Sequence, residues 1–516
     1  MCFATNSKCP ISLSLVRKMS IFGPEFEKMW PKAGQSALKL TNFGRNLLKN
    51  CQSIAKPDVG DINIKDFIQK SSNFPLEFGT NTCRVVSQPV ERYPSIQQQI
   101  ASAYPVIHER VLGLYLAFLE HKCQYGNKRE LEIYRRLSLI DFVQRLLTKR
   151  CASFFGKNDK FLLITHERGV SGFMDIGTDV EKPPLLLHNV LSYDEIKLSA
   201  LLSVSSRSDL INDGNRQNQG VVDYSRIERE GVVIGLIGAR LTRRDVMEFQ
   251  DIIISKTQNT KANGYGEHGD DTADNRSKDY RRLWKQFYEE DDFLFDQVTK
   301  DNKRFSDSKN KNDIFDNLIM KKRYTISFDT LLLDSEARAS AAGKQAFIHV
   351  VGIGLGVWRT SESQEKVFLE TFAQRLKALL PCLNHIAVVH FSWFHLSEWG
   401  ELKNNGMFKS TSHPDGGIRT FLSKRNPADK LKTPEESDML LIVSYAWDGN
   451  ALPGNEFWMK MLKSTGDSST ACSTLISELH NPHINTQMVH SSNLHIAAEQ
   501  FGVVHIADYA KKVLNS

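Results

Sequence analysis

The sequence predicts an α/β fold of three layers, because short apolar runs alternate with stretches of helical periodicity from residue 160 onward. Five of these runs are typical of buried strands: 161–166, 232–238, 346–358, 385–391 and 440–446. Helices are expected between the strands, at 193–202, 244–254, 364–380 and 456–463. Near the carboxyl end, strands at 487–490 and 503–507 are expected on either side of a helix at 494–501.

The amino-terminal part has a different character. Residues 1–90 are rich in Ser, Asn, Lys and Pro, which predicts a poorly ordered lead-in with one short helix near 34–53. Residues 91–159 predict amphipathic helices that pack on the core, with Pro105 kinking or restarting the first of them. Residues 160–516 then form the main α/β domain, and the polar stretch 256–313 is interpreted as a solvated insertion with one helix near 280–295.

Composition excludes several function classes. The net charge of +6 is small for 516 residues, and Lys and Arg are mixed with Asp and Glu, so we expect no nucleic-acid partner. Apolar runs are too short to cross a bilayer, so no membrane partner is expected. The eight cysteines form no CxxC pair, which favours free thiols in the cytoplasm. No HExxH, GxSxG or Walker pattern occurs, and we expect neither a metal nor a cofactor.

The segment 443–458 (VSYAWDGNALPGNEFW) is the strongest candidate for a ligand-binding loop. It joins a buried strand to an expected helix, and open α/β sheets bind ligands at the carboxyl ends of their strands. Helix amino termini attract phosphate groups, and glycines let the backbone approach them closely. The candidate ligand-binding residues of this loop are Gly449, Asn450, Gly454 and Asn455. Its acids, Asp448 and Glu456, are open to a purely structural interpretation as turn and helix-start residues.

Two further strand ends offer candidate ligand contacts. The run Gly352–Trp358 closes the strand that begins at 346, and Gly354, Gly356 and Trp358 are candidates there, although glycines in strands more often mark bulges. Arg240 follows the strand 232–238 and suits either a phosphate or an ion pair with a local acid. The acids Asp329, Asp334 and Glu336 are interpreted as surface residues, with a position lining the cleft as the alternative.

The segment AWDGNALPGNEFW (446–458), behind an alternating α/β pattern, resembles the MavL-like family of macrodomain-related ADP-ribosyl hydrolases. Weaker parts of the resemblance are Gly238-Ala239-Arg240 with Glu248, and the 352–358 run. The resemblance implies a macrodomain-like mixed sheet that binds ADP-ribose and removes it from modified arginine side chains of proteins, including ubiquitin. Carried over to this chain, the catalytic acids would be Asp448, Glu456 and Asp467.

Cleavage of an N-glycosidic bond develops positive charge on the ribose, so one carboxylate would activate water while another stabilises the cation or the departing guanidinium. Two alternatives remain open at this point. The same cleft would serve a non-catalytic ADP-ribose reader, and the helical segment with the polar stretch 256–313 would serve a protein-interaction scaffold.

Overall fold

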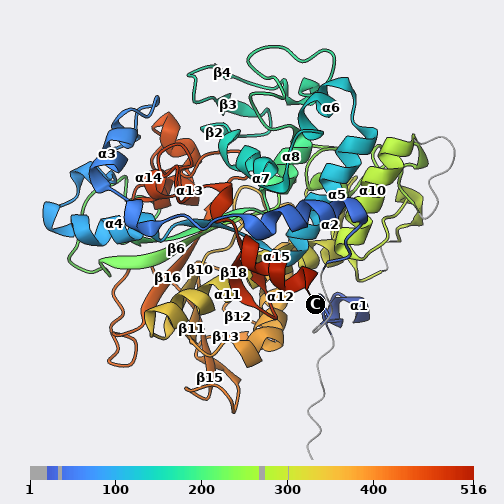
Figure 1. Ribbon diagram of the computed structural model, residues 1–516. Helices are drawn as coiled ribbons and strands as arrows, with labels where there is room; N and C mark the ends of the chain where they lie inside the picture. Colours follow the sequence, from blue (N-terminus) through green and yellow to red (C-terminus); the bar gives the residue numbers. More distant parts are fainter. Residues whose placement is uncertain (1–19, 33–37, 267–273, 300–301, 516) are drawn as a thin grey trace, which may run out of the picture.

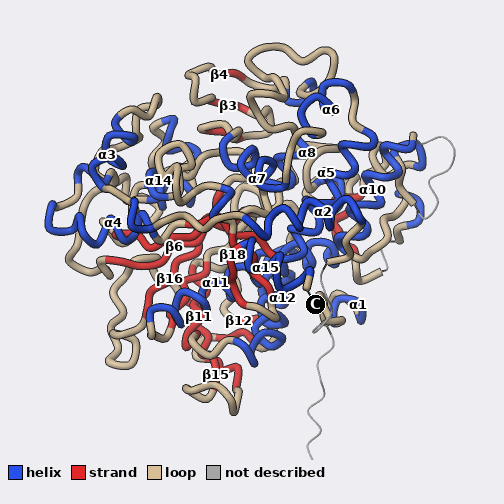
Figure 2. Tube along the Cα trace, in the orientation of Figure 1, coloured by secondary structure: helices blue, strands red, loops and turns tan. Residues whose placement is uncertain are grey.

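The computed structural model of the protein describes residues 20–32, 38–266, 274–299 and 302–515. Its centre is a mixed sheet of ten strands in the order β14-β15-β11-β10-β16-β6-β5-β1-β17-β18, with helices packed around it (Figures 1 and 2). The strands are β1 (Tyr104–His108), β5 (Ser203–Asp209), β6 (Glu230–Ile237), β10 (Ala346–Val350), β11 (Ile386–Ser392), β14 (Gly406–Lys409), β15 (Gly417–Ser423), β16 (Leu440–Trp447), β17 (His495–Ala498) and β18 (Gly502–His505).

Five neighbouring strands, β15, β11, β10, β16 and β6, run parallel to one another. In their centre Val443 of β16 pairs with Val233 of β6 on one side and His349 of β10 on the other. Their apolar runs are buried on both faces, which is typical of parallel strands. The α/β prediction is therefore confirmed for this part of the sheet, and the carboxyl ends of these strands lie at one edge.

The run predicted as a strand at 161–166 is not part of the central sheet. It forms β3 (Lys160–Leu162), which pairs with β2 (Ser153–Phe155) and β4 (Arg168–Gly169) in a small antiparallel sheet. Two other small sheets contain β7 (Ile253–Ile254), β8 (Phe305–Asp307) and β9 (Ile314–Asp316), and β12 (Glu398–Trp399) and β13 (Leu402–Lys403).

The helices surround the sheet and several of them match the sequence expectation, notably α8 and α12. They are α1 (Pro24–Glu27), α2 (Asn42–Asn50), α3 (Ile64–Ser72), α4 (Tyr93–Ala101), α5 (Glu109–Tyr125), α6 (Lys128–Tyr134), α7 (Leu139–Thr148), α8 (Tyr193–Ser199), α9 (Phe249–Ile252), α10 (Asn275–Tyr288), α11 (Asn317–Ala342), α12 (Gln364–Leu379), α13 (Gly466–Ala471), α14 (Ile476–Leu479) and α15 (Ile506–Leu514).

The longest described helix, α11, was not foreseen. Its side chains are buried on all sides over most of its 26 residues, so no polar stripe gives it the periodicity of a surface helix. The interpretation of Asp329 and Asp334 as surface residues is wrong, because both lie on this helix with at most 2% of their area exposed. Arg375 on α12 donates to Asp329 over 2.6 Å, and this ion pair lets the carboxylate be buried.

The amino-terminal part is more regular than its composition suggests. Residues 42–72 contain α2 and α3, whose first turns are capped by Thr41 and Asn63. The segment predicted to be only helical contributes β1, which lies inside the central sheet between β5 and β17. Residues 1–19 and 33–37, on which parts of the lead-in and its helix were expected, lie outside the described residues.

The prediction for the carboxyl end is confirmed for the strand near 503–507, which is β18, and wrong for the two elements before it. Residues 487–490 form turns, and the expected helix at 494–501 is instead β17 and the turn that leads to β18. Ile496 pairs with Ile107 of β1 and with Val504 of β18, so sheet pairing overrides the helical preference of the Ala-Ala-Glu-Gln stretch.

The polar stretch 256–313 contains α10, which packs on α5. Trp284 of this helix is buried, and the ammonium group of Lys197 lies 3.6 Å from its ring centroid. Residues 267–273 and 300–301 of the stretch are not among the described ones.

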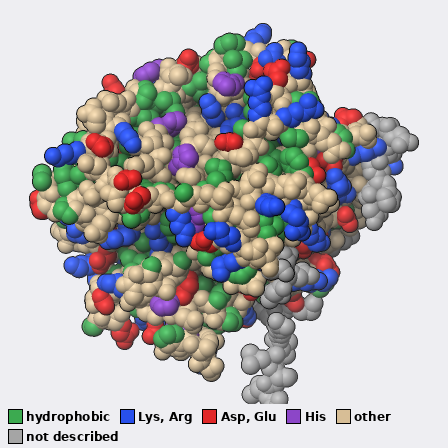
Figure 3. Space-filling model, in the orientation of Figure 1, with side chains coloured by type: hydrophobic (Ala, Val, Ile, Leu, Met, Phe, Trp, Pro, Cys, Tyr) green, Lys and Arg blue, Asp and Glu red, His purple; other side chains and the backbone are tan. Residues whose placement is uncertain are grey.

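Basic and acidic side chains alternate over the face drawn in Figure 3, without a continuous basic patch. Within the part of the chain that the structure describes, no helix has the length and apolar character needed to span a membrane.

Candidate active site

The loops that follow β6, β10 and β16 converge at the carboxyl edge of the sheet. Gly238, after β6, approaches Gly354, after β10, so closely that a Cβ at Gly238 would lie 2.8 Å from the Gly354 nitrogen. The loop after β16 joins them because Arg240 Nη1 donates to Asp448 Oδ2 over 3.1 Å. Three segments distant in the sequence therefore build one site, as the positions of parallel strand ends predict.

Asp448 is buried at the end of β16, with 4% of its area exposed. Its Oδ1 accepts from the Asn450 backbone nitrogen at 3.2 Å, and its Oδ2 accepts from Arg240 and, more weakly, from Asn455. Burial raises the pKa of Asp448, while the charge of Arg240 opposes that rise. The carboxylate is held in one orientation and is shielded from bulk water.

Arg240 is a supporting residue of this site. Its Nη2 donates to the Gly156 carbonyl oxygen at 3.0 Å and lies 3.4 Å from Asp159 Oδ1, and its guanidinium stacks 4.2 Å from the Phe154 ring centroid. Of the two sequence interpretations, the ion pair with a local acid is the one that the structure contains. The Trp358 ring centroid lies 5.8 Å from the guanidinium carbon.

Glu456 and Asp467 add two further buried carboxylates. The expected helix at 456–463 is a short 3-10 helix, Asn455–Met459, and Glu456 within it accepts from Thr465 Oγ1 at 2.9 Å. Asp467 lies in the first turn of α13, where its Oδ1 accepts from the Gly454 nitrogen at 2.7 Å. Among the described residues, its Oδ2 has no hydrogen-bond partner.

The three acids influence one another electrostatically. Burial raises the pKa of Asp467 well above its ordinary value, and the charges of Glu456 and Asp448 raise it further. The pKa of Glu456 is also raised, first by burial and then by Asp448. Neighbouring carboxylates whose pKa values are raised in this way do not ionise independently of one another, a condition that general acid and base chemistry can use.

Asp467→Asn is expected to stabilise the fold near about pH 8, with an advantage that disappears at acid pH. The pKa of Asp467 is higher in the folded state than in the unfolded state. The wild type therefore loses stability as the pH rises from the unfolded-state pKa through the folded-state pKa. Asparagine does not titrate, and the difference amounts to about 1.4 kcal/mol for each unit of pKa elevation. Urea unfolding at several pH values measures it. The exposed Asp438 provides the control, since Asp438→Asn should change stability little at any pH; equal behaviour of the two variants would contradict the expectation.

The small residues of the 448–455 loop are packed against protein. A Cβ at Gly449 would lie 2.9 Å from the Ala200 Cα, and Gly454 has a φ of 104°. The Asn455 side chain accepts from the Phe154 nitrogen at 2.9 Å and from Ser153 Oγ. Asn455 does not cap the short helix that it begins, because its side chain binds β2 and Gly454 occupies the cap position. Asn450 is fully buried, and its Oδ1 has no partner within the described part of the chain.

Gly449→Ala is expected to lower the free energy of unfolding by about 1–3 kcal/mol, because the added methyl group overlaps the Ala200 backbone. Chemical denaturation measures the loss. Gly356→Ala is the matched control, since a Cβ at Gly356 would meet nothing within 4 Å. Equal denaturation midpoints for the two variants would rule out the packing argument.

The glycine run after β10 is a loop, and the strand ends at Val350. Gly354 has a φ of 73°, and its carbonyl oxygen accepts from the Gln364 side chain at 3.0 Å, which ties the loop to the first turn of α12. Gly356 is exposed and Trp358 is half-buried. This run is therefore the most accessible part of the predicted site.

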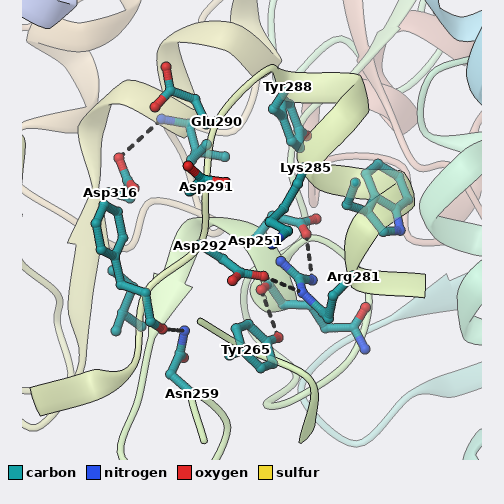
Figure 4. A pocket seen from close by; sticks show the side chains of 15 residues that line it. Asp251, Asn259, Tyr265, Arg281, Lys285, Tyr288, Glu290, Asp291, Asp292 and Asp316 are labelled. Atoms are coloured by element: carbon teal, nitrogen blue, oxygen red, sulfur yellow. Dashed lines mark hydrogen bonds and ion pairs between the residues drawn. The ribbon is translucent and has the colours of Figure 1, made fainter. Parts of the chain in front are cut away.

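Two hollows lie elsewhere on the described surface. The first is lined by α10 and the segments around it, and Figure 4 shows Arg281 between Asp251 and Asp292. Arg281 donates to both acids at 2.9 Å, so these buried charges are paired and their role is structural. The second is a groove between residues 71–84 and Lys460, beside the 3-10 helix that carries Glu456. Neither contains the three acids in its lining.

Sequence reasoning missed two charged residues at the site. Arg150 lies with its guanidinium carbon 4.2 Å from the Trp447 ring centroid, and Asp159 binds Arg240. Both belong to loops between short elements and carry no motif that would single them out. No group of three or more potential ligands is arranged to hold a metal within the described ranges.

An α/β sheet with coupled, buried carboxylates at its carboxyl edge is the class of site that suits hydrolysis of a glycosidic bond. A family model described as "ADP-ribosylhydrolase MavL-like" matches residues 65–512, and the chain belongs to this MavL-like family. The family resemblance inferred from residues 446–458 is thereby confirmed.

Two Drosophila melanogaster proteins are similar over nearly the whole chain. The ADP-ribosylarginine hydrolase CG2909 is 58% identical over 500 residues, covering 96% of this chain and 99% of the relative. The ADP-ribosylarginine hydrolase CG3568 is 52% identical over 492 residues, covering 94% and 95%.

Proposed function

We propose that this protein is an ADP-ribosylarginine hydrolase, which uses water to release ADP-ribose from modified arginine side chains. The observation that carries the proposal is the cluster of Asp448, Glu456 and Asp467 in a chain that is similar over nearly its full length to relatives named for that activity. The family membership supports the same reaction.

The proposed chemistry divides the work among the three acids. Asp448 stays ionised beside Arg240 and stabilises the positive charge that develops on the ribose as the C–N bond breaks. The coupled pair Glu456 and Asp467 accepts a proton from the attacking water and supplies one to the departing guanidine nitrogen. The products are ADP-ribose and an unmodified arginine side chain.

The anionic end of the ligand is proposed to lie against the glycine loop. Gly354, Gly356 and Trp358 precede α12, and exposed backbone nitrogen atoms near a helix amino terminus suit a pyrophosphate. Gly449, Asn450, Gly454 and Asn455 are proposed to shape the floor beneath the acids, a role that fits their close packing.

The finer fold assignment is part of the proposal. We propose that the parallel block and its helices form a macrodomain-like, three-layered unit within residues 160–516, with 256–313 as an insertion and the preceding segments packed on it. ADP-ribosylated proteins are the expected partners, with ubiquitin as the first candidate. The cytoplasm is the proposed compartment, and the six cysteines within the described ranges are free.

The test uses mass spectrometry to measure the release of ADP-ribose from a peptide that is ADP-ribosylated on arginine. Hydrolysis of the arginine-linked peptide, with a serine-linked peptide unchanged, is the expected result. If the protein binds ADP-ribose but releases none at high enzyme concentration, it is a reader; if it binds none, the scaffold interpretation gains support. Comparing free ADP-ribosylarginine with modified ubiquitin tests the protein partner.

A further inference from the structure

Trp393 has an unusual environment for a residue of its type. It follows β11 directly, and 57% of its area is exposed. Its φ of 65° lies in the left-handed region, which bulky side chains rarely adopt. Such strain costs about 1–3 kcal/mol and is concentrated at functional sites, where surrounding contacts maintain it.

The contacts that maintain it hold the indole in place without burying it. Trp393 Nε1 donates to the Arg425 carbonyl oxygen over 3.0 Å. Arg425 is itself fixed, because its Nη1 donates to the Asn426 carbonyl oxygen at 3.0 Å and its guanidinium lies 4.7 Å from the Phe347 ring centroid. The aromatic surface is therefore rigid and accessible, which lowers the entropic cost of binding a flat ligand.

Trp393 lies at the same sheet edge as the three acids. The order β11-β10-β16 puts it two strands from Asp448, which corresponds to about 10 Å at ordinary strand spacing. The glycine run follows β10, the strand between them, and exposes Val357 over 73% of its area. The Lys424 ammonium group is 5.8 Å from the indole centroid and adds positive charge beside it.

ADP-ribose carries its adenine at the end opposite the reacting ribose carbon, with the pyrophosphate between. A ligand with its reacting carbon at the acids and its phosphates at the glycine run must extend its base along the edge toward β11. We propose that this adenine stacks on Trp393 and that the ammonium group of Lys424 attracts the neighbouring negative charge of the phosphates. This inference rests on the proposed function, and it assigns Trp393 to binding and specificity, not to bond cleavage.

The experiment compares two ligands and three variants by calorimetry. Trp393→Ala is expected to weaken ADP-ribose binding by roughly 5- to 150-fold, the range for loss of one base–aromatic stack. Ribose 5-phosphate lacks the base, so its affinity should not change. Trp393→Phe keeps an aromatic face and should retain most of the affinity. Trp399→Phe is the matched control, because the Trp399 indole donates to Glu370 and leaves less surface exposed.

Two outcomes would overturn the inference while leaving the proposed function intact. One is unchanged ADP-ribose affinity in Trp393→Ala. The other is an equal loss for ribose 5-phosphate, which would mean a general disturbance of the site. Failure of the wild type to bind ADP-ribose at all would instead remove the proposed function and this inference together. Thermal unfolding of each variant checks that the fold is kept.

Discussion

Glu456→Gln is expected to reduce hydrolysis of ADP-ribosylated arginine by about 100- to 10,000-fold, the usual contribution of a general acid or base. Glutamine keeps the side-chain length and can still accept the hydrogen bond from Thr465 Oγ1, so the 3-10 helix and the neighbouring acids should stay in place. The substitution removes only the ability to exchange a proton. Turnover measured under saturating substrate, beside calorimetric binding of ADP-ribose, separates this effect from a loss of affinity.

The matched control is Glu77→Gln. Glu77 is exposed and pairs with Lys460, which directly follows the 3-10 helix that carries Glu456. Replacing the Glu77 carboxylate should leave turnover unchanged. Full turnover in Glu456→Gln would remove Glu456 from the proposed chemistry and leave Asp448 and Asp467 as the candidates. Weak ADP-ribose binding with a lowered melting temperature would identify Glu456 as a structural residue.

Arg240→Met is expected to lower the free energy of unfolding by about 3–5 kcal/mol, because it leaves the buried carboxylate of Asp448 without its cation. The expected effect is much larger than that of Arg243→Met, because Arg243 is 31% exposed and meets Asp159 at 3.5 Å. Urea denaturation of both variants measures the difference.

A second substitution tests the cause of the loss. Asp448→Asn in the Arg240→Met background removes the uncompensated charge and should restore part of the stability, although not the activity. If the double variant is less stable than the wild type by the full sum of the two single losses, the two side chains act independently. The support role of Arg240 would then need another explanation, such as its stacking on Phe154.

The sequence predicted those parts of the fold whose pattern is local. The strands β6, β10, β11 and β16 are apolar runs bounded by turn residues, and α8 and α12 have clear periodicity. It failed for α11, whose burial on every side erases the periodic signal, and for β1 and β17, which pair with each other across nearly 400 residues.

The candidate site shows the same division. The acids of the 448–456 loop could be identified because a strand end followed by glycines and carboxylates is a local pattern. The pairing of Asp448 with Arg240 could not be predicted from the sequence. Whether Arg240 contacts a phosphate or a carboxylate depends on where the 238–240 and 156–159 loops lie. The left-handed conformation of Trp393 likewise depends on Arg425, a residue of a different strand end.

The position of β1 between β5 and β17 limits how this chain can be shortened. A protein that starts at residue 160 would keep every strand of the parallel block but would lose the strand that joins it to β17 and β18. The edges of β5 and β17 would then be unpaired and face solvent, and such edges recruit other chains. Removing the first 159 residues should therefore give a product that aggregates. The shortest form of the protein that folds should include the segment that contains β1.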